Sequence, residues 1–141
     1  MEKILVDTNA FVSFYWENDP NHKIADKIFT KYSSHNSIFY TNNYLVSEIL
    51  TVLLFKTKAV KKVVKLGENF YFAKSNVKVV QVPISWQKKA LKIFSQQSKP
   101  NLSFPDCALI VQSISQKIKT IFTFDKNIRK ASILKDCRFL P

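Results

Sequence analysis

The chain has 141 residues, 46% of them hydrophobic, and its net charge is +12, from 22 Lys and Arg against 10 Asp and Glu. This length suits one domain with a real core, so we expect residues 1–141 to form a single domain. The hydrophobic content argues against disorder. Only one glycine is present, which argues against a glycine-rich phosphate loop and the nucleotide-binding enzymes that depend on one.

The basic excess favours a polyanionic partner, with RNA or DNA first and a membrane surface second. Arginine occurs only at Arg129 and Arg138. Lysine acts on phosphate as a point charge, so we expect binding that is dominated by the nucleic-acid backbone. Cys107 and Cys137 are too few for a disulfide framework and are expected to be reduced and buried. No signal peptide or membrane span is visible, so we expect a cytoplasmic protein without membrane contact.

The chain begins with a short apolar run, Ile4 to Val6, that suits a buried strand. Asp7 follows at once, and a helical pattern that includes Phe11 comes next. A carboxylate at this junction has two interpretations. It is either a helix N-cap or a functional group at the ligand-binding edge of an α/β sheet. On this stretch alone the cap is favoured, and the rest of the chain reverses that order.

A second helix is expected over residues 19–34 and a second strand over residues 37–40. Thr41 then has the character of an N-cap for a long helix that reaches Phe55. Glu48 is the only charged residue in this strand and helix before Lys56, and its helical neighbours are mostly apolar. A carboxylate in such surroundings needs a cation or hydrogen-bond donors.

A basic amphipathic helix is expected from Lys56 onward, with lysines interleaved with valines. Two interpretations stay open here, an ordinary solvated face and a surface for RNA. The candidate RNA-binding residues are Lys56, Lys58, Lys61, Lys62 and Lys65. Phe70, Tyr71 and Phe72 follow, and three adjacent aromatics cannot all face one core from a helix. One of them is therefore expected at a protein interface.

A third strand is expected over residues 77–83. The helix that follows from Ser85 should turn four residues inward, namely Trp86, Ala90, Leu91 and Phe94. Ser103 is a good N-cap for the next helix, Pro105 fits its first turn, and Asp106 completes a near capping box. A carboxylate in the first turn also gains from the helix dipole, so the capping and functional interpretations of Asp106 are compatible. Five residues of this region should pack inward, namely Leu109, Ile110, Val111, Ile114 and Ile118.

The last informative stretch repeats the pattern of the first. Residues 120–124 suit a strand, and Asp125 follows immediately. Here too the alternative is an N-cap or turn residue. A short helix is expected over residues 127–131, and residues 137–141 suit an edge strand.

Four carboxylates therefore stand out, Asp7, Glu48, Asp106 and Asp125. Alternating strands and helices imply a mostly parallel sheet, whose strand ends share one edge. Carboxylates gathered there would repel one another, and a divalent cation removes that penalty. Oxygen ligands without Cys or His favour Mg²⁺ or Mn²⁺ over Zn²⁺. An acidic metal pocket in a basic chain suits phosphodiester hydrolysis.

The ordered motifs resemble those of the PIN-domain ribonucleases, most of all the VapC-type toxins of toxin–antitoxin pairs. The resemblance covers nearly the whole chain and rests on ILVDTNAF, SEIL, LSFPDCALI and IFTFDKNI. It implies a three-layer α/β/α sandwich with a mostly parallel central sheet. It also implies a metal-dependent endoribonuclease in which Asp7, Glu48, Asp106 and Asp125 bind Mg²⁺ or Mn²⁺ and activate water. Asn9 and Thr123 match positions that often support the site.

The resemblance further implies an RNA substrate and a cognate antitoxin. Aromatic residues crowd the first helix at Phe11, Phe14, Tyr15 and Trp16, and we expect some of them to form a homodimer or antitoxin surface. The chain departs from many relatives at Asn127, where they carry an acidic residue, so a second metal ion is not implied.

Two other functions stay open. The same fold could serve as a non-catalytic RNA-binding or regulatory module. Aspartate phosphotransferases and receiver domains also place Asp after a strand, but the phosphotransferase pattern expects a second acidic residue where Asn9 stands. His22 and His35 lie far from the carboxylate motifs in sequence and are expected to be solvated. A paired-histidine mechanism therefore has little support.

Overall fold

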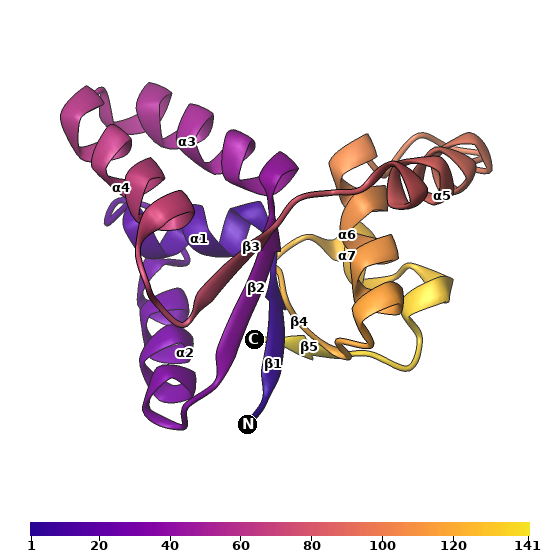
Figure 1. Ribbon diagram of the computed structural model, residues 1–141, viewed down its shortest axis with the longest axis horizontal. Helices are drawn as coiled ribbons and strands as arrows, with labels where there is room; N and C mark the ends of the chain where they lie inside the picture. Colours follow the sequence, from indigo (N-terminus) through magenta and orange to yellow (C-terminus); the bar gives the residue numbers. More distant parts are fainter.

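The computed structural model describes all residues, 1–141. Its centre is one sheet of five parallel strands in the order β3-β2-β1-β4-β5 (Figure 1). The strands are β1 (Lys3–Val6), β2 (Ile38–Asn42), β3 (Val77–Val80), β4 (Thr120–Phe122) and β5 (Arg138–Leu140). The central strand β1 places Ile4 beside Phe39 of β2, and Leu5 beside Ile121 of β4. The expected parallel sheet and the C-terminal edge strand are confirmed.

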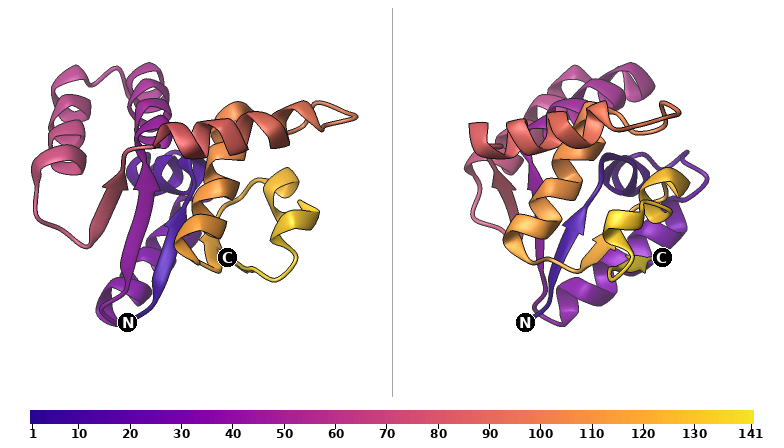
Figure 2. Two further views of the ribbon diagram at one scale, coloured as in Figure 1. Left: turned by 45° about the vertical axis from the view of Figure 1, so that its right-hand side comes forward. Right: turned by 90° about the vertical axis from the view of Figure 1, so that its right-hand side faces the viewer.

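Helices cover both faces of this sheet, so the expected three-layer α/β/α sandwich is confirmed (Figures 1 and 2). One face carries α1 (Thr8–Tyr15), α2 (His22–Ser34), α3 (Asn43–Thr57) and α4 (Val60–Phe72). The other carries α6 (Phe104–Gln116), α7 (Lys126–Arg129) and a short 3₁₀ turn (Ser132–Leu134), and α5 (Ile84–Ser95) packs against α6. No helix is long and apolar enough to cross a bilayer.

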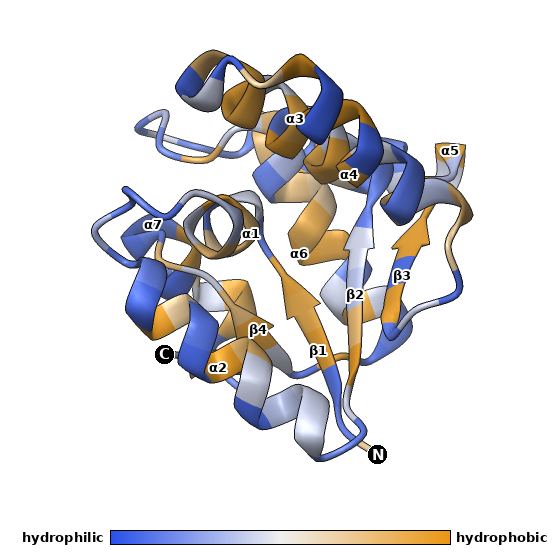
Figure 3. Ribbon diagram, turned by 90° about the vertical axis from the view of Figure 1, so that its left-hand side faces the viewer, coloured by the Kyte–Doolittle hydropathy of each residue, from blue (hydrophilic) through white to orange (hydrophobic).

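The alternation of side chains along β1 builds a core on each face. Ile4 and Val6 pack among the residues of α1 to α4, whereas Leu5 packs among those of α6 and α7. Strand β1 is hydrophobic along most of its length, and the covering helices alternate hydrophobic and hydrophilic residues (Figure 3). Phe11 stacks on Phe29 with ring centroids 5.3 Å apart. Part of the aromatic crowding in α1 therefore serves the core.

The expectation of one continuous basic helix from Lys56 onward is wrong. Helix α3 ends at Thr57, and Lys58 has a left-handed backbone with φ of 56° before α4 starts at Val60. The break has no Gly or Pro to signal it. It lets α4 fold back on α3, where the only glycine, Gly67, lies so close to Leu50 that a Cβ would be 3.2 Å from its side chain.

Other local expectations also need correction. Asn42 caps α3 by accepting from the Leu45 N–H, whereas Thr41 belongs to β2. Cys107 is buried but Cys137 is only half-buried. Three residues expected to face inward are exposed, namely Leu91, Phe94 and Ile114. Helix α5 lies at the edge of the molecule and is covered by α6 along one stripe that includes Ala90, which leaves Leu91 largely exposed and Phe94 partly exposed beside Phe104.

Candidate active site

The acidic residues gather where the strand order reverses, at the carboxyl ends of the adjacent strands β1 and β4. From β1 the sheet continues through β2 and β3 on one side, and from β4 through β5 on the other. Loops diverge at such a point and leave a crevice for a ligand. Asp7 directly follows β1, and its backbone N–H donates to the Phe122 carbonyl at the end of β4 (3.0 Å).

Asp7 is the buried member of the group, with 3% of its surface exposed. It caps α1, because its Oδ1 accepts from the Thr8 N–H at 2.8 Å. Its Oδ2 accepts from Thr123 Oγ1 at 2.8 Å and from Asn9 Nδ2 at 3.2 Å. The cap interpretation of this residue is confirmed, and it is compatible with a functional role, because only one oxygen serves the helix.

Thr123 ties the loop after β4 to Asp7. Its fully buried hydroxyl donates to Asp7 and accepts from the Asp125 N–H at 3.0 Å. Asn9 spans the same gap, because its Oδ1 accepts from the Phe124 N–H at 2.9 Å. Both positions that the resemblance suggested as supporting residues thus contact the Asp7 carboxylate directly.

Replacing this hydroxyl tests how strongly the site depends on it. We expect Thr123→Val to lower the free energy of unfolding of the metal-free protein by about 2 kcal/mol near neutral pH, since a buried acceptor loses its donor. The loss should shrink in mild acid, where Asp7 is protonated. Thr123→Ser keeps the hydroxyl and is the matched control. Urea unfolding of the three proteins at two pH values measures both effects, and equal losses for Val and Ser would contradict the role of the hydroxyl.

Asp106 enters the site from the start of α6. The expected capping box is present, because the Ser103 N–H donates to Asp106 Oδ2 at 2.8 Å and the Asp106 N–H donates to Ser103 Oγ at 3.2 Å. Asp125 caps the short α7 by accepting from the Asn127 N–H at 2.8 Å. Each carboxylate is thus held by its own helix terminus.

Three of the four predicted carboxylates converge. One oxygen from each of Asp7, Asp106 and Asp125 lies within 4.8 Å of the others. Glu48 stands outside this cluster and accepts from Thr8 Oγ1 at 2.9 Å. All four carboxylates line one cavity of about 700 Å³, which we call the acidic cavity.

Burial and mutual repulsion oppose ionisation here. Burial raises the pKa of Asp7 from 3.8 to about 7, against the opposing hydrogen bond from Thr123, and the charges of Asp106 and Asp125 add to the increase. Burial also raises the pKa of Glu48 and of Asp106. A cation bound among these oxygens would offset both the cost of burying the charges and their mutual repulsion.

The spacing of the cluster fits a divalent cation. Oxygens bound at about 2.1 Å to one Mg²⁺ lie at most about 4.2 Å apart, so a small inward movement of the side chains would let all three residues bind the same ion. The donors are carboxylate oxygens, which hard cations prefer.

The two histidines lie outside the acidic cavity. The expectation that His22 is solvated is wrong, because this side chain is half-buried and its Nδ1 lies 2.8 Å from the Ser13 carbonyl oxygen. His35 is exposed and lies outside the acidic cavity.

The family model for the PIN domain matches residues 4–134. The chain belongs to the PIN domain family. Among curated proteins, none matches the sequence.

Solved structures share the PIN fold across nearly the whole chain. VapC20 of Mycobacterium tuberculosis, described as a toxin that cleaves the sarcin–ricin loop, is 19% identical, with a TM-score of 0.80 over 92% of this chain and 95% of its own. VapBC2 of Rickettsia felis, solved with a promoter DNA fragment, is 9% identical, with a TM-score of 0.67 over 97% and 96%. FitAcB of Neisseria gonorrhoeae is 13% identical, with a TM-score of 0.63 over 98% and 96%.

The predicted lysines of this PIN domain fall into two sets. Lys56 lines the acidic cavity, and together with Lys62 it also lines a neighbouring cavity. Lys58, Lys61 and Lys65 are exposed and line neither. The break at Lys58 turns the two helices against each other and brings Lys56 and Lys62 to the same cavity.

Sequence reasoning missed several residues that line the acidic cavity, namely Thr8, Val12, Trp16, Asp19, Pro20, Val52 and Ser103. Thr8 follows Asp7 directly, but only the packing of α3 shows that its hydroxyl bonds Glu48. In the sequence Trp16 is one of several crowded aromatics. No pattern in the sequence indicates that it lines the cavity.

Proposed function

We propose that this chain is a metal-dependent endoribonuclease that hydrolyses RNA phosphodiester bonds and acts as the toxin of a toxin–antitoxin pair in the cytoplasm. Residues 1–141 would work as one domain. The observation that carries the proposal is the convergence of carboxylate oxygens from Asp7, Asp106 and Asp125 at the switch point of a PIN fold.

In this proposal Asp7, Asp106 and Asp125 hold Mg²⁺ or Mn²⁺, and Glu48, which lines the same cavity, completes the catalytic set. When bound, the ion supplies charge neutralisation at the scissile phosphate and a more acidic water. Thr123 and Asn9 orient the buried carboxylate of Asp7. Glu48, with its pKa raised by burial and its Oε2 fixed by Thr8, accepts the proton of the attacking water.

The partners are part of the same proposal. Phe72 at the end of α4 is 83% exposed and Phe55 on α3 is 75% exposed, and aromatic side chains are enriched at protein interfaces. We propose that a homodimer or the antitoxin covers them. The R. felis relative is named as a VapBC complex, which supports an antitoxin partner. The lysines named above would attract the RNA substrate.

RNA cleavage by the purified protein tests this function. We expect Mg²⁺- or Mn²⁺-dependent cleavage that leaves a 5′-phosphate and a 3′-hydroxyl, since water and not the RNA 2′-hydroxyl attacks the phosphorus. Asp106→Asn should lower the rate about 10³-fold or more, although Asn can still accept from the Ser103 N–H. Asp26→Asn, an exposed acid on α2, is the matched control.

End-group analysis of the products decides the outcome. A 2′,3′-cyclic phosphate that persists in excess chelator and in Asp106→Asn protein would overturn the assignment of the carboxylates. RNA binding without cleavage under any metal would instead identify a non-catalytic RNA-binding module.

A further inference from the structure

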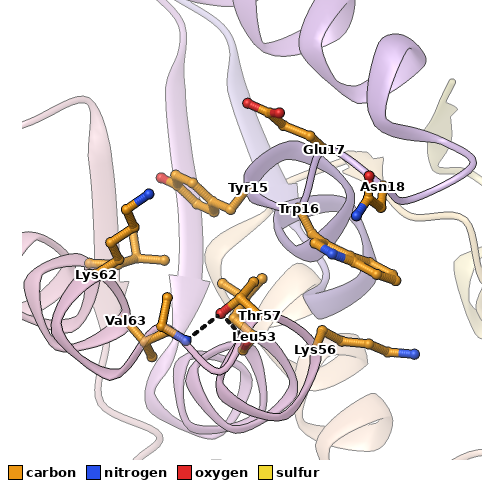
Figure 4. A pocket seen from close by; sticks show the side chains of 11 residues that line it. Tyr15, Trp16, Glu17, Asn18, Leu53, Lys56, Thr57, Lys62 and Val63 are labelled. Atoms are coloured by element: carbon orange, nitrogen blue, oxygen red, sulfur yellow. Dashed lines mark hydrogen bonds between the residues drawn. The ribbon is translucent and has the colours of Figure 1, made fainter.

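The acidic cavity shares two lining residues with a second cavity of about 570 Å³, which we call the side cavity. It lies between the end of α1 and the hairpin of α3 and α4 (Figure 4). Its walls include Tyr15, Leu53 and Leu66 on the apolar side, with Lys62 at one end. Its volume is in the range typical of small-ligand sites.

Two residues line both cavities, Trp16 and Lys56. The Lys56 ammonium lies 5.0 Å from the centroid of the Trp16 ring, a cation–π contact that restrains both side chains. The backbone N–H of Trp16 is bonded to the Val12 carbonyl and ends α1. An aromatic ring is thus held between the acidic cavity and the side cavity.

We propose that the side cavity receives an unpaired RNA base next to the scissile phosphate, with that base stacked on Trp16. The inference rests on the proposed function, because it assumes that the same strand enters the acidic cavity. Aromatic rings are the usual platforms for unpaired bases, since every base has a π-face. An RNA duplex could not place a base there without unpairing it.

The charges around the two cavities suit a nucleic-acid strand whose phosphates reach the side cavity and whose scissile phosphate is met by a cation. The acidic cavity carries five carboxylates, those of Asp7, Asp19, Glu48, Asp106 and Asp125, and so repels an anion that arrives without a cation. Lysines border the side cavity at Lys56 and Lys62, against a single carboxylate from Glu17. Phosphates on either side of a stacked base would meet these two ammonium groups.

The chain offers a direct spectroscopic test. It has two tryptophans, and Trp86 on α5 lines neither cavity. Trp86→Phe therefore leaves Trp16 as the only indole. We expect single-stranded oligouridylate, mixed rapidly with the Trp86→Phe protein in Mg²⁺ and followed before cleavage sets in, to quench its emission, and the same RNA paired with oligoadenylate to quench it far less.

Substitutions separate stacking from charge. Trp16→Ala should weaken the binding of oligouridylate about tenfold without changing its salt dependence, and Trp16→Phe should recover most of the loss. Lys56→Ala should reduce the slope of log affinity against log salt concentration by about one. Circular dichroism checks that each variant is folded.

Three results would overturn the inference. The first is RNA binding with no quenching of Trp16. The second is an unchanged affinity in Trp16→Ala. The third is quenching by the antitoxin but not by RNA, which would identify a protein-binding surface. Failure of the proposed function would look different. Quenching by RNA together with no metal-dependent cleavage would support the base site and contradict the nuclease function. Cleavage without quenching would support the nuclease function and contradict the base site.

Discussion

Asp7→Asn is expected to abolish RNA cleavage and, at the same time, to stabilise the metal-free protein. Both effects follow from one buried charge. The carboxylate of Asp7 is 3% exposed and lies within 4.8 Å of oxygens from Asp106 and Asp125. The amide keeps the shape of the side chain but carries no charge to bind a cation or to repel its neighbours.

The gain in stability can be estimated from the pKa. Because burial raises the pKa of Asp7 from 3.8 to about 7, ionising it in the folded protein costs roughly 4 kcal/mol above neutral pH. The amide avoids that cost but fits the hydrogen bonds of Thr123 and Asn9 less well, a loss of about 1–2 kcal/mol. We therefore expect Asp7→Asn to raise the free energy of unfolding by about 2 kcal/mol at about pH 8, measured by urea unfolding in chelator.

The loss of activity should be at least about 10³-fold in kcat/KM, since the substitution removes one of the carboxylates proposed to hold the metal. Asp136→Asn, an exposed acid before β5, is the control for both measurements and should change neither. A stable variant that still cleaves RNA would show that Asp7 is only a helix cap. An inactive variant that is also less stable would show that the hydrogen bonds of the carboxylate outweigh its desolvation.

The second large effect is a dependence of the free energy of unfolding on pH, which differs between the metal-free and the metal-bound protein. Because the pKa of Asp7 is higher in the folded state than in the unfolded state, the unfolded chain releases its proton first as the pH rises. The free energy of unfolding of the metal-free protein should therefore fall between about pH 4 and pH 7 and level off above that. The raised pKa values of Glu48 and Asp106 act in the same direction.

A divalent cation should reverse this trend. Protons compete with the cation below about pH 7, so Mn²⁺ or Mg²⁺ should stabilise the protein strongly at about pH 8 and little at about pH 5. At a hundred times the dissociation constant the gain is about 2.7 kcal/mol. Thermal unfolding with and without the ion at both pH values measures it.

In Asp7→Asn both the pH dependence and the effect of the cation should be much smaller. Equal stabilisation of the parent protein at the two pH values would contradict a carboxylate site for the ion.

The sequence alone predicted the candidate carboxylates and how Asp7 and Asp106 are held locally. An apolar run followed directly by Asp7 predicts a carboxylate at a strand end, and Ser103 with Asp106 predicts a capping box. These patterns are local, since each depends on the backbone of a few neighbouring residues. The order of strands and helices likewise determined a parallel sheet, because such chains bring their strand ends to one edge.

Only the tertiary structure decided which of these residues meet. The packing of α3 and α1 sets Glu48 apart from the three aspartates and gives it Thr8 as a partner. The turn at Lys58 divides a lysine-rich stretch that looked continuous and opens the side cavity beside Trp16. Distances between side chains from different elements depend on how whole helices and strands pack. That packing is a sum of many weak contacts across the chain and leaves no local pattern in the sequence.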